Sequence, residues 1–313
     1  MKVAIIAGDA PAELIRMMPA LTDAGRAVPG LELTVFGAPV VAALARRHEL
    51  VRRAVEVPFD SLAVRWWNRA ARGRRRRFFA SLEGRDQPFD RLIDPIGSAA
   101  TADLARLLSA SRRCGLGRDQ LTDARLARHY DELYPLPDHL HPVQRHRVLM
   151  AAVLDYGIHD LKPDYGVAPA NPELARTGTG VVVSLDAAAV GWSEPEVEQV
   201  VTRLEEQGVD VSRLPAEAPE PSDETAWWSQ VEQAGYVIAG NNATAHLAAA
   251  LGRPGLTLCP EGQAATCSAI SNRYARRAMV GIDQSRLVRP EVVAEATLRT
   301  LERMHEQDEV AFG

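Results

Sequence analysis

The sequence predicts an α/β fold made of two doubly wound domains whose sheets are mostly parallel. Strand-like apolar runs alternate with helical patterns along the chain, and the alternation restarts after a proline-rich stretch at residues 162–173. The length of 313 residues also exceeds the usual size of one domain. We therefore expect domains at residues 1–160 and 161–313, with the last helix able to pack back on the first domain and a ligand cleft between the two.

The first half begins with the apolar run KVAIIAG, which predicts a buried strand at residues 2–8. A helix is expected to follow, because Pro11 suits a first helical position and Gly25 suits a helix end. Further strands are expected at residues 31–37, 53–58, 89–94 and 114–117, and further helices at residues 39–48, 98–111 and 142–157.

The second half repeats this order. The run GVVVSLD predicts a strand at residues 180–186, and a helical pattern then runs from residue 194 to Gly208. The polar residues 215–224 predict a loop. Further strands are expected at residues 236–240 and 256–259, and further helices at residues 226–235, 243–252 and 290–307.

Composition indicates a soluble intracellular protein. Hydrophobic residues make up 46% of the chain, charged residues make up 25%, and the apolar stretches are too short to span a bilayer. Three cysteines without metal-ligand spacing favour a reducing cytoplasm. His139, His141 and His146 lie close in sequence, but their spacing fits no closed zinc site, so we expect no metal.

The stretch YVIAGNNATAHLAAALG at residues 236–252 is the most specific text in the chain. A strand ends in small polar residues, and the next helix opens with small side chains only. Backbone N–H groups and the helix dipole make such a helix start an anion site that a phosphate can approach closely. The alternative is a packing helix with Asn241 or Asn242 as an ordinary N-cap.

Residues 236–259 also resemble the C-terminal signature of glycosyltransferase family 9, the bacterial lipopolysaccharide heptosyltransferases. In that signature a strand is followed by Asp-Thr, small residues, His-Leu-x-x-Ala-Leu and an Arg-Pro turn. The matching residues here are Asn241, Asn242, His246, Leu247, Ala250, Leu251, Arg253 and Pro254. The resemblance extends over nearly the whole chain, through residues 1–24, 89–110, 141–157 and 191–208, and is greatest to the heptosyltransferase I branch.

The resemblance implies the GT-B fold of two Rossmann-like domains and an inverting, metal-independent sugar transfer without a cofactor. The implied donor is a nucleotide-diphosphate sugar similar to ADP-heptose, and the implied acceptor is an anionic glycolipid similar to Kdo-lipid A. The implied location is the cytoplasm, in peripheral contact with the inner membrane. The donor-binding residues expected from the match are Asn241, Asn242, Thr244, His246 and Trp192.

The donor side departs from the family pattern. Asn241 stands where the family has an aspartate, and Val190 and Gly191 precede Trp192 where the family has a lysine. The loop after the last family strand is also different, and reads PEGQAATC at residues 260–267. A catalytically degenerate member that binds nucleotide or glycan is therefore an alternative. A Rossmann-type sugar-nucleotide epimerase or dehydrogenase is a further one, although no G-x-G-x-x-G follows the first strand.

Inverting transfer needs a carboxylate that takes the proton of the acceptor hydroxyl. Asp9 and Glu13 both stand at the first strand-to-helix turn. A gapless match to the family places Glu13 at the position of the base, whereas a match on the Gly-Asp pair places Asp9 there. We expect Glu13 to be the base, with Asp9 as the second candidate. The alternative is that both acids only complement the helix N-terminus.

An arginine-rich segment at residues 65–79 contrasts with the formal net charge of −5 of the whole chain. The aromatic residues Trp66, Trp67, Phe78 and Phe79 lie beside its arginines, and the segment stands at the place where the family has its acceptor loop. We expect it to bind the anionic acceptor at the membrane surface, rather than nucleic acid, because no nucleic-acid module accompanies it. A solvated helix face is the other alternative. The expected acceptor-binding residues are Arg65, Arg69, Arg72, Arg74, Arg75, Arg76 and Arg77.

Overall fold

The computed structural model describes residues 1–59, 73, 76–78, 80, 88–167, 180–217, 219–283 and 288–312. Two compact units divide the chain: residues 1–167 with 220–224, and residues 168–219 with 225–313. The boundary after Val167 lies within the proline-rich stretch at residues 162–173, after which the alternation was expected to restart. The expected packing of the last helix on the first domain, and the expected cleft, stay predictions.

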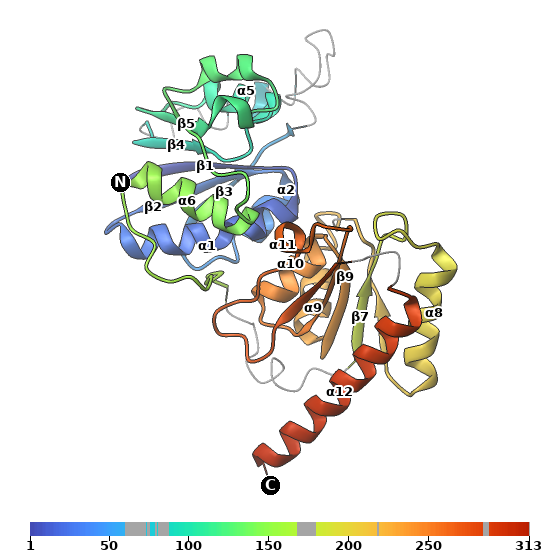
Figure 1. Cartoon of the computed structure of the whole chain (residues 1–313). Helices are drawn as coiled ribbons and strands as arrows, with labels where there is room; N and C mark the ends of the chain where they lie inside the picture. The colour runs from blue at the N-terminus through green and yellow to red at the C-terminus, as the bar shows by residue number, and fades with distance from the viewer. Residues whose placement is uncertain are drawn as a thin grey trace. The chain divides into compact units, whose positions relative to one another are not determined.

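The first unit is a six-stranded parallel sheet in the order β3-β2-β1-β4-β5-β6 (Figure 1). Its strands are β1 (Lys2–Gly8), β2 (Glu32–Gly37), β3 (Val51–Glu56), β4 (Arg91–Asp94), β5 (Arg113–Leu116) and β6 (Glu132–Tyr134). Its α-helices are α1 (Pro11–Ala27), α2 (Pro39–Ala45), α5 (Ala99–Leu107) and α6 (Pro142–Leu154), and two 3₁₀ helices are η1 (Arg118–Gln120) and η2 (Ala124–His129). The order reverses between β1 and β4, which makes this the switch point of the sheet.

The chain order fixes which face each helix covers. Connections between parallel strands are right-handed. Helix α1 connects β1 to β2 on one side of the switch point, and α5 connects β4 to β5 on the other side, so the two helices lie on opposite faces of the sheet. Helix α6 packs along α1 and therefore shares its face. Strand β1 is buried along all but its first residue, as expected for a central parallel strand covered by helices on both faces.

Two helix ends in the first unit differ from the predicted ones. Helix α1 continues to Ala27, because Gly25 packs inside the helix, where an added Cβ would lie 2.6 Å from Leu50 Cδ1. Helix α6 ends at Leu154, three residues before the predicted end at residue 157. The reason is that Asp155 adopts a left-handed conformation with φ of 57°. Other helices of this unit end within a few residues of their predicted bounds.

A buried ion pair joins α1 to α6. Arg147 is 1% exposed, and its Nε donates to Asp23 Oδ2 at 2.6 Å. The other nitrogens of this guanidinium donate to the carbonyl oxygens of Asp160 at 2.5 Å and Leu161 at 3.2 Å. Arg147 therefore ties the chain that leaves α6 back onto the helix pair.

The second unit is a five-stranded parallel sheet in the order β11-β10-β9-β7-β8. Its strands are β7 (Val181–Ser184), β8 (Val211–Arg213), β9 (Tyr236–Gly240), β10 (Gly255–Cys259) and β11 (Met279–Asp283). Its helices are α8 (Glu194–Glu206), α9 (Glu224–Gln233), α10 (Ala243–Ala250), α11 (Ala264–Cys267) and α12 (Pro290–Phe312). The order reverses between β7 and β9, the second switch point.

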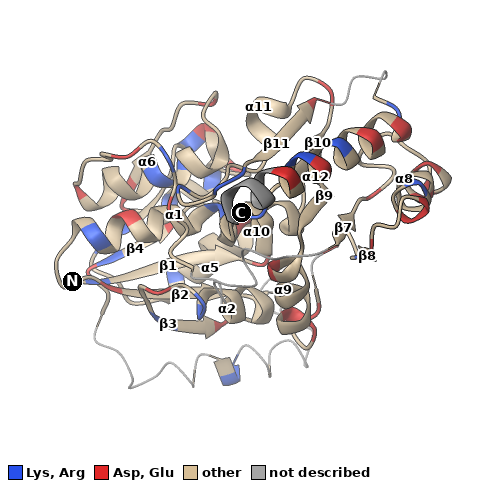
Figure 2. Ribbon diagram, turned by 90° about the horizontal axis from the view of Figure 1, so that it is seen from below, with Lys and Arg blue, Asp and Glu red and all other residues tan. Residues whose placement is uncertain are grey.

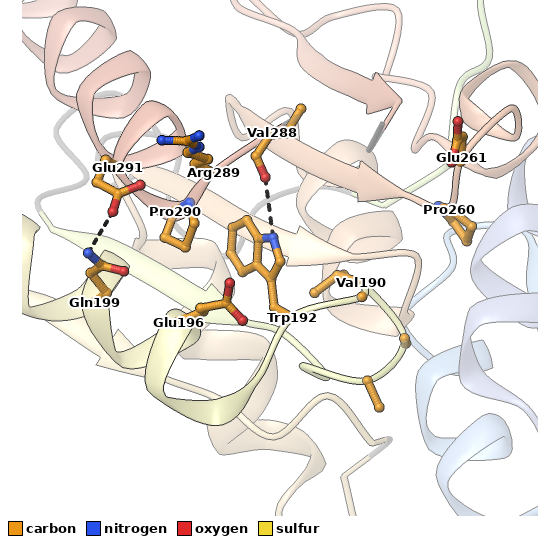
Figure 3. Close-up of a pocket in the computed structure, with 13 residues that line it drawn as sticks. Val190, Trp192, Glu196, Gln199, Pro260, Glu261, Val288, Arg289, Pro290 and Glu291 are labelled. Atoms are coloured by element: carbon orange, nitrogen blue, oxygen red, sulfur yellow. Dashed lines mark hydrogen bonds between the residues drawn. The ribbon is translucent and has the colours of Figure 1, made fainter. Parts of the chain in front are cut away.

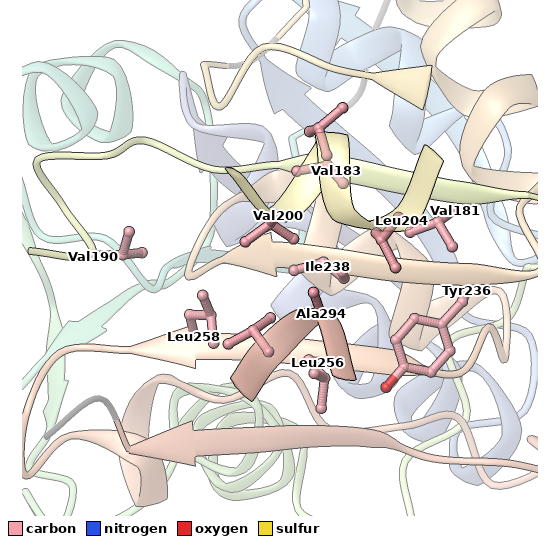
Figure 4. Close-up of a cluster of buried hydrophobic side chains, with 12 residues drawn as sticks. Val181, Val183, Val190, Val200, Leu204, Tyr236, Ile238, Leu256, Leu258 and Ala294 are labelled. Carbon is pink, nitrogen blue, oxygen red and sulfur yellow. The ribbon is translucent and has the colours of Figure 1, made fainter. Parts of the chain in front are cut away.

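The core of the second unit forms where α8 and α12 cover one face of the sheet (Figure 4). Val183 of β7 and Ile238 of β9 meet Val200 and Leu204 of α8 and Ala294 of α12, and all five are at most 2% exposed. The outward positions of α8 carry acidic side chains (Figure 2). None of the described helices is long and apolar enough to cross a membrane. The predicted α/β class with two parallel sheets is confirmed.

Candidate functional site

A pocket of about 370 Å³ lies at the carboxyl end of the first sheet, at its switch point. Its lining includes Glu13 of α1 and Pro95 and Ile96, which follow β4. Carboxyl ends of parallel strands at a switch point are the usual place for ligands in such sheets. We call it the Glu13 pocket; its lining is Glu13, Pro95, Ile96, Leu116, Gln120, Leu136, Pro142, Arg145, His146 and Leu149.

The Glu13 carboxylate is held from two sides. Arg16 Nη1 donates to Oε1 at 2.5 Å from one turn further along α1. His146 Nε2 lies 3.3 Å from Oε2 and reaches it from α6. Burial raises the pKa of Glu13, but the hydrogen bond and charge of His146, followed by Arg16, outweigh it and hold the pKa at about 2. Glu13 is therefore ionised at neutral pH.

Asp9, the second candidate base, directly follows β1. Its side chain is exposed and is not part of the described lining of the Glu13 pocket. The structure thus places Glu13, but not Asp9, among the charged groups of this pocket. The choice of Glu13 over Asp9 as the base stays a prediction.

Asp94 supports the turn that lines the pocket, and it was not among the site residues predicted from the sequence. This residue ends β4 and is fully buried, and burial raises its pKa. It accepts hydrogen bonds from Tyr130 Oη at 2.6 Å and from the backbone nitrogens of Ile96 at 2.9 Å and Gly97 at 3.1 Å. These bonds fix the turn that carries Pro95 and Ile96 into the pocket. An acid at the carboxyl end of a predicted strand was the available signal.

The histidines that lie close in sequence have separate roles. His141 caps α6 by accepting a hydrogen bond from the Val143 nitrogen at 3.2 Å, whereas His146 faces Glu13. Within the described ranges, no group of three or more His, Cys, Asp or Glu side chains is placed to hold a metal ion.

In the second unit the predicted anion site lies at the start of α10, beside the second switch point. Asn242 caps the helix by accepting from the Ala245 nitrogen at 3.1 Å, and its Nδ2 donates to the Ser184 carbonyl oxygen at 2.9 Å. The Thr244 hydroxyl is 2% exposed and accepts from Trp227 Nε1 at 3.1 Å. Asn242 thus joins the start of α10 to the end of β7, and Thr244 joins it to α9.

The other two residues of this helix start form a pair. Asn241 is exposed, and its Oδ1 lies 3.0 Å from Nε2 of His246, which is 1% exposed. Asn241 is therefore the side chain that the start of α10 presents outward, with His246 behind it.

A second pocket, of about 580 Å³, lies beside the predicted donor residue Trp192 (Figure 3). The Trp192 indole donates to the Val288 carbonyl oxygen at 3.4 Å. Arg289 is the single cation of the described lining, against the three acids Glu196, Glu261 and Glu291. Asn241, Asn242, Thr244 and His246 are not among the described lining residues, so the expected donor residues divide between this pocket and the start of α10.

Most of the arginine-rich segment falls outside the described residues, including Arg65, Arg69, Arg72, Arg74 and Arg75. Arg76 and Arg77 are described and exposed, and Phe78 beside them is 7% exposed. Arg77 Nε donates to the Gly73 carbonyl oxygen at 3.4 Å.

Comparison with known proteins places these features in a family. No protein-family model matches the chain. It is 30% identical over 218 residues to lipopolysaccharide heptosyltransferase 1 of Pseudomonas aeruginosa, which spans 69% of this chain and 61% of that protein. It is 23% identical over 281 residues to lipopolysaccharide heptosyltransferase 1 of Escherichia coli K12, which spans 82% of this chain and 87% of that protein.

A solved heptosyltransferase structure has a fold similar to that of this chain. The E. coli heptosyltransferase WaaC with ADP superimposes with a TM-score of 0.75 and 20% identity, over 97% of this chain and all of that one. This likeness establishes the GT-B fold of two Rossmann-like domains. Together with the sequence relatives, it shows that the chain belongs to the lipopolysaccharide heptosyltransferases of glycosyltransferase family 9.

Proposed function

We propose that the chain is an inverting glycosyltransferase, which moves a heptose-like sugar from a nucleoside diphosphate to a hydroxyl of an anionic glycolipid. Family membership supports the reaction class, and the ADP named with the E. coli structure supports an ADP-heptose-like donor. The relatives' name, lipopolysaccharide heptosyltransferase 1, supports a lipopolysaccharide acceptor, for which we propose an anionic lipid similar to Kdo-lipid A.

The observation that carries this proposal is the ionised Glu13 carboxylate in a pocket at the first switch point. In a single displacement the acceptor oxygen bonds to the anomeric carbon as the bond to the diphosphate breaks, and the diphosphate leaves with the electron pair. Glu13 takes the hydroxyl proton. A carboxylate with a pKa near 2 is a weak base, so the proton moves late, once the forming bond has made the hydroxyl strongly acidic.

We assign the donor to the second unit. The start of α10 offers a helix dipole and the exposed Asn241, which suit the diphosphate. Asn242, Thr244 and His246 hold this helix start in place. The pocket beside Trp192 has one arginine against three glutamates, so it suits the hydroxyl groups of a sugar or ribose better than a phosphate.

We assign the arginine-rich segment to the acceptor and to the cytoplasmic surface of the inner membrane. Changing Arg74, Arg75, Arg76 and Arg77 together to serine is expected to weaken binding to anionic vesicles, because each basic residue near such a surface is worth about 1 kcal/mol. The KM for the acceptor should rise, while donor affinity stays unchanged. Vesicle sedimentation at two salt concentrations measures the effect, and vesicle binding as tight as that of the parent protein would contradict this assignment.

The transfer reaction itself tests the proposed function. Whole protein, ADP-heptose and a Kdo-lipid A acceptor are expected to give one heptosylated product per ADP released, as measured by mass spectrometry. A protein that binds ADP in calorimetry but forms no product with active donor and acceptor would instead be a degenerate, binding-only member of the family.

A further inference from the structure

His146 contacts the carboxylate of Glu13 from a second helix, α6, and is itself buried. It is 7% exposed and belongs to the lining of the Glu13 pocket. Its Nε2 lies 3.3 Å from Glu13 Oε2, whereas Oε1 is bound by Arg16 at 2.5 Å. An ionised carboxylate offers acceptors only, so Nε2 carries a hydrogen and donates. The two oxygens of the expected base are thus held by two different kinds of donor.

These two donors differ in how their charge responds to pH. The guanidinium of an arginine keeps its positive charge in proteins. An imidazole ordinarily loses its charge between about pH 5 and pH 8, yet an Nε2–H group can donate the same hydrogen bond in the neutral and in the charged form. Arg16 is therefore a constant charge beside Glu13, and His146 is a variable one.

The charge of His146 acts directly on the basicity of Glu13. Burial raises the pKa of Glu13, and the hydrogen bond and charge of His146 are the largest of the effects that lower it, to about 2. When the imidazole becomes neutral, the hydrogen bond remains but the attraction between opposite charges is lost. The carboxylate then binds a proton more tightly, while Arg16 still favours its ionised form.

The other side chains packed around α6 are of types that keep their charge in this pH range, apart from one histidine. Helix α1 and strand β6 pack on α6, and Arg145 lines the pocket beside His146. Carboxylates, guanidinium groups and phenols ordinarily titrate outside the range from about pH 5 to pH 8. His141, at the start of α6, accepts from the Val143 nitrogen and is not part of the described lining. The titratable or charged side chains of α1 and β6, besides Glu13, are Arg16, Asp23, Arg26, Glu132 and Tyr134.

We propose that His146 is a positioning residue that sets the strength of Glu13 as a base: it donates to the carboxylate in both of its charge states, and the loss of its charge makes Glu13 a stronger acceptor of the hydroxyl proton. Transfer should therefore become faster as the pH rises through the range in which an imidazole is deprotonated. The inference rests on the proposed function for the reaction that is accelerated, but the coupling between the imidazole and the carboxylate does not depend on it.

The pH dependence of kcat tests this role. His146→Gln keeps an N–H donor of similar reach but carries no charge at any pH. From about pH 5 to pH 8, kcat of the parent protein is expected to rise about 3–10-fold, and kcat of the variant by less than about twofold. The variant should therefore be faster than the parent at the acidic end, which structural damage would not produce. Phosphate groups of the substrates titrate alike in both proteins, so the difference between the two profiles isolates His146.

His139→Gln is the matched control, because it removes another histidine of the same unit. His139 is exposed and lies outside the described lining of the Glu13 pocket, so this variant should keep the profile of the parent. A rise in kcat that persists in His146→Gln, or one that disappears in His139→Gln, would overturn the proposal.

Nuclear magnetic resonance of whole protein labelled with ¹³C-glutamate measures the coupling without any transfer, and Glu13→Gln assigns the signal. The Glu13 carboxyl signal of the parent is expected to move between about pH 5 and pH 8 and to stay constant in His146→Gln, because Glu13 itself remains ionised. A stationary signal in the parent would refute the coupling, even if the protein transfers heptose. A moving signal in a protein that transfers no sugar would uphold the coupling and refute the proposed function.

Discussion

Replacing Glu13 with glutamine is expected to lower kcat by about 10²–10⁴-fold, the usual contribution of a general base. Glutamine keeps the shape of the side chain and can still accept from Arg16, but it cannot take the acceptor proton. Donor affinity should stay unchanged, since we assign the donor to the second unit. Steady-state transfer kinetics and calorimetry with ADP measure the two effects.

Asp9→Asn is the matched control for Glu13→Gln, because it neutralises the other acid of the same turn. Asp9 is exposed and lies outside the described lining of the Glu13 pocket, so its loss should change kcat little. If Asp9→Asn abolishes transfer while Glu13→Gln leaves it intact, the base has been assigned to the wrong residue.

Replacing Asp23 with alanine is expected to lower the free energy of unfolding by about 3 kcal/mol. The change leaves Arg147 as a buried cation whose remaining partners include the carbonyl oxygens of residues 160 and 161, which carry no charge. Removing one member of a buried pair costs more than the pair contributes, because the other charge stays without compensation. Urea unfolding followed by circular dichroism measures the loss.

Asp103→Ala provides the comparison for Asp23→Ala. Asp103 lies on α5 of the same unit, half-exposed and 3.9 Å from Arg106, and exposed pairs of this kind contribute about 0–1 kcal/mol. An equal loss in the two variants would show that Asp23 does not balance a buried charge.

The sequence predicted the central elements of both sheets because buried parallel strands are continuous apolar runs. Strand β1 and strand β9 were found in this way. The strands β6, β8 and β11 were not predicted. The first two have three residues each, too few to show a period, and β11 lies at the edge of its sheet with partly exposed residues. The strand order was not predicted either, because it depends on which way each crossover turns.

The candidate site was predictable where it depends on local sequence. Glu13 stands at a strand-to-helix turn that the sequence predicted. Asn242 is the N-cap of α10, a helix that was also predicted from the sequence. Its partner His146 is 133 residues away in sequence, so no spacing could reveal the contact with Glu13. Arg145 is also far from Glu13 in the sequence, and it lines the pocket because α6 packs on α1.

A crystal structure of the whole protein with an acceptor headgroup and an unreactive donor analogue tests the central claim most directly. The account predicts that the acceptor occupies the Glu13 pocket, with its reacting hydroxyl about 3 Å from a Glu13 carboxylate oxygen. An acceptor bound elsewhere, with the Glu13 carboxylate still closed between Arg16 and His146, would contradict it.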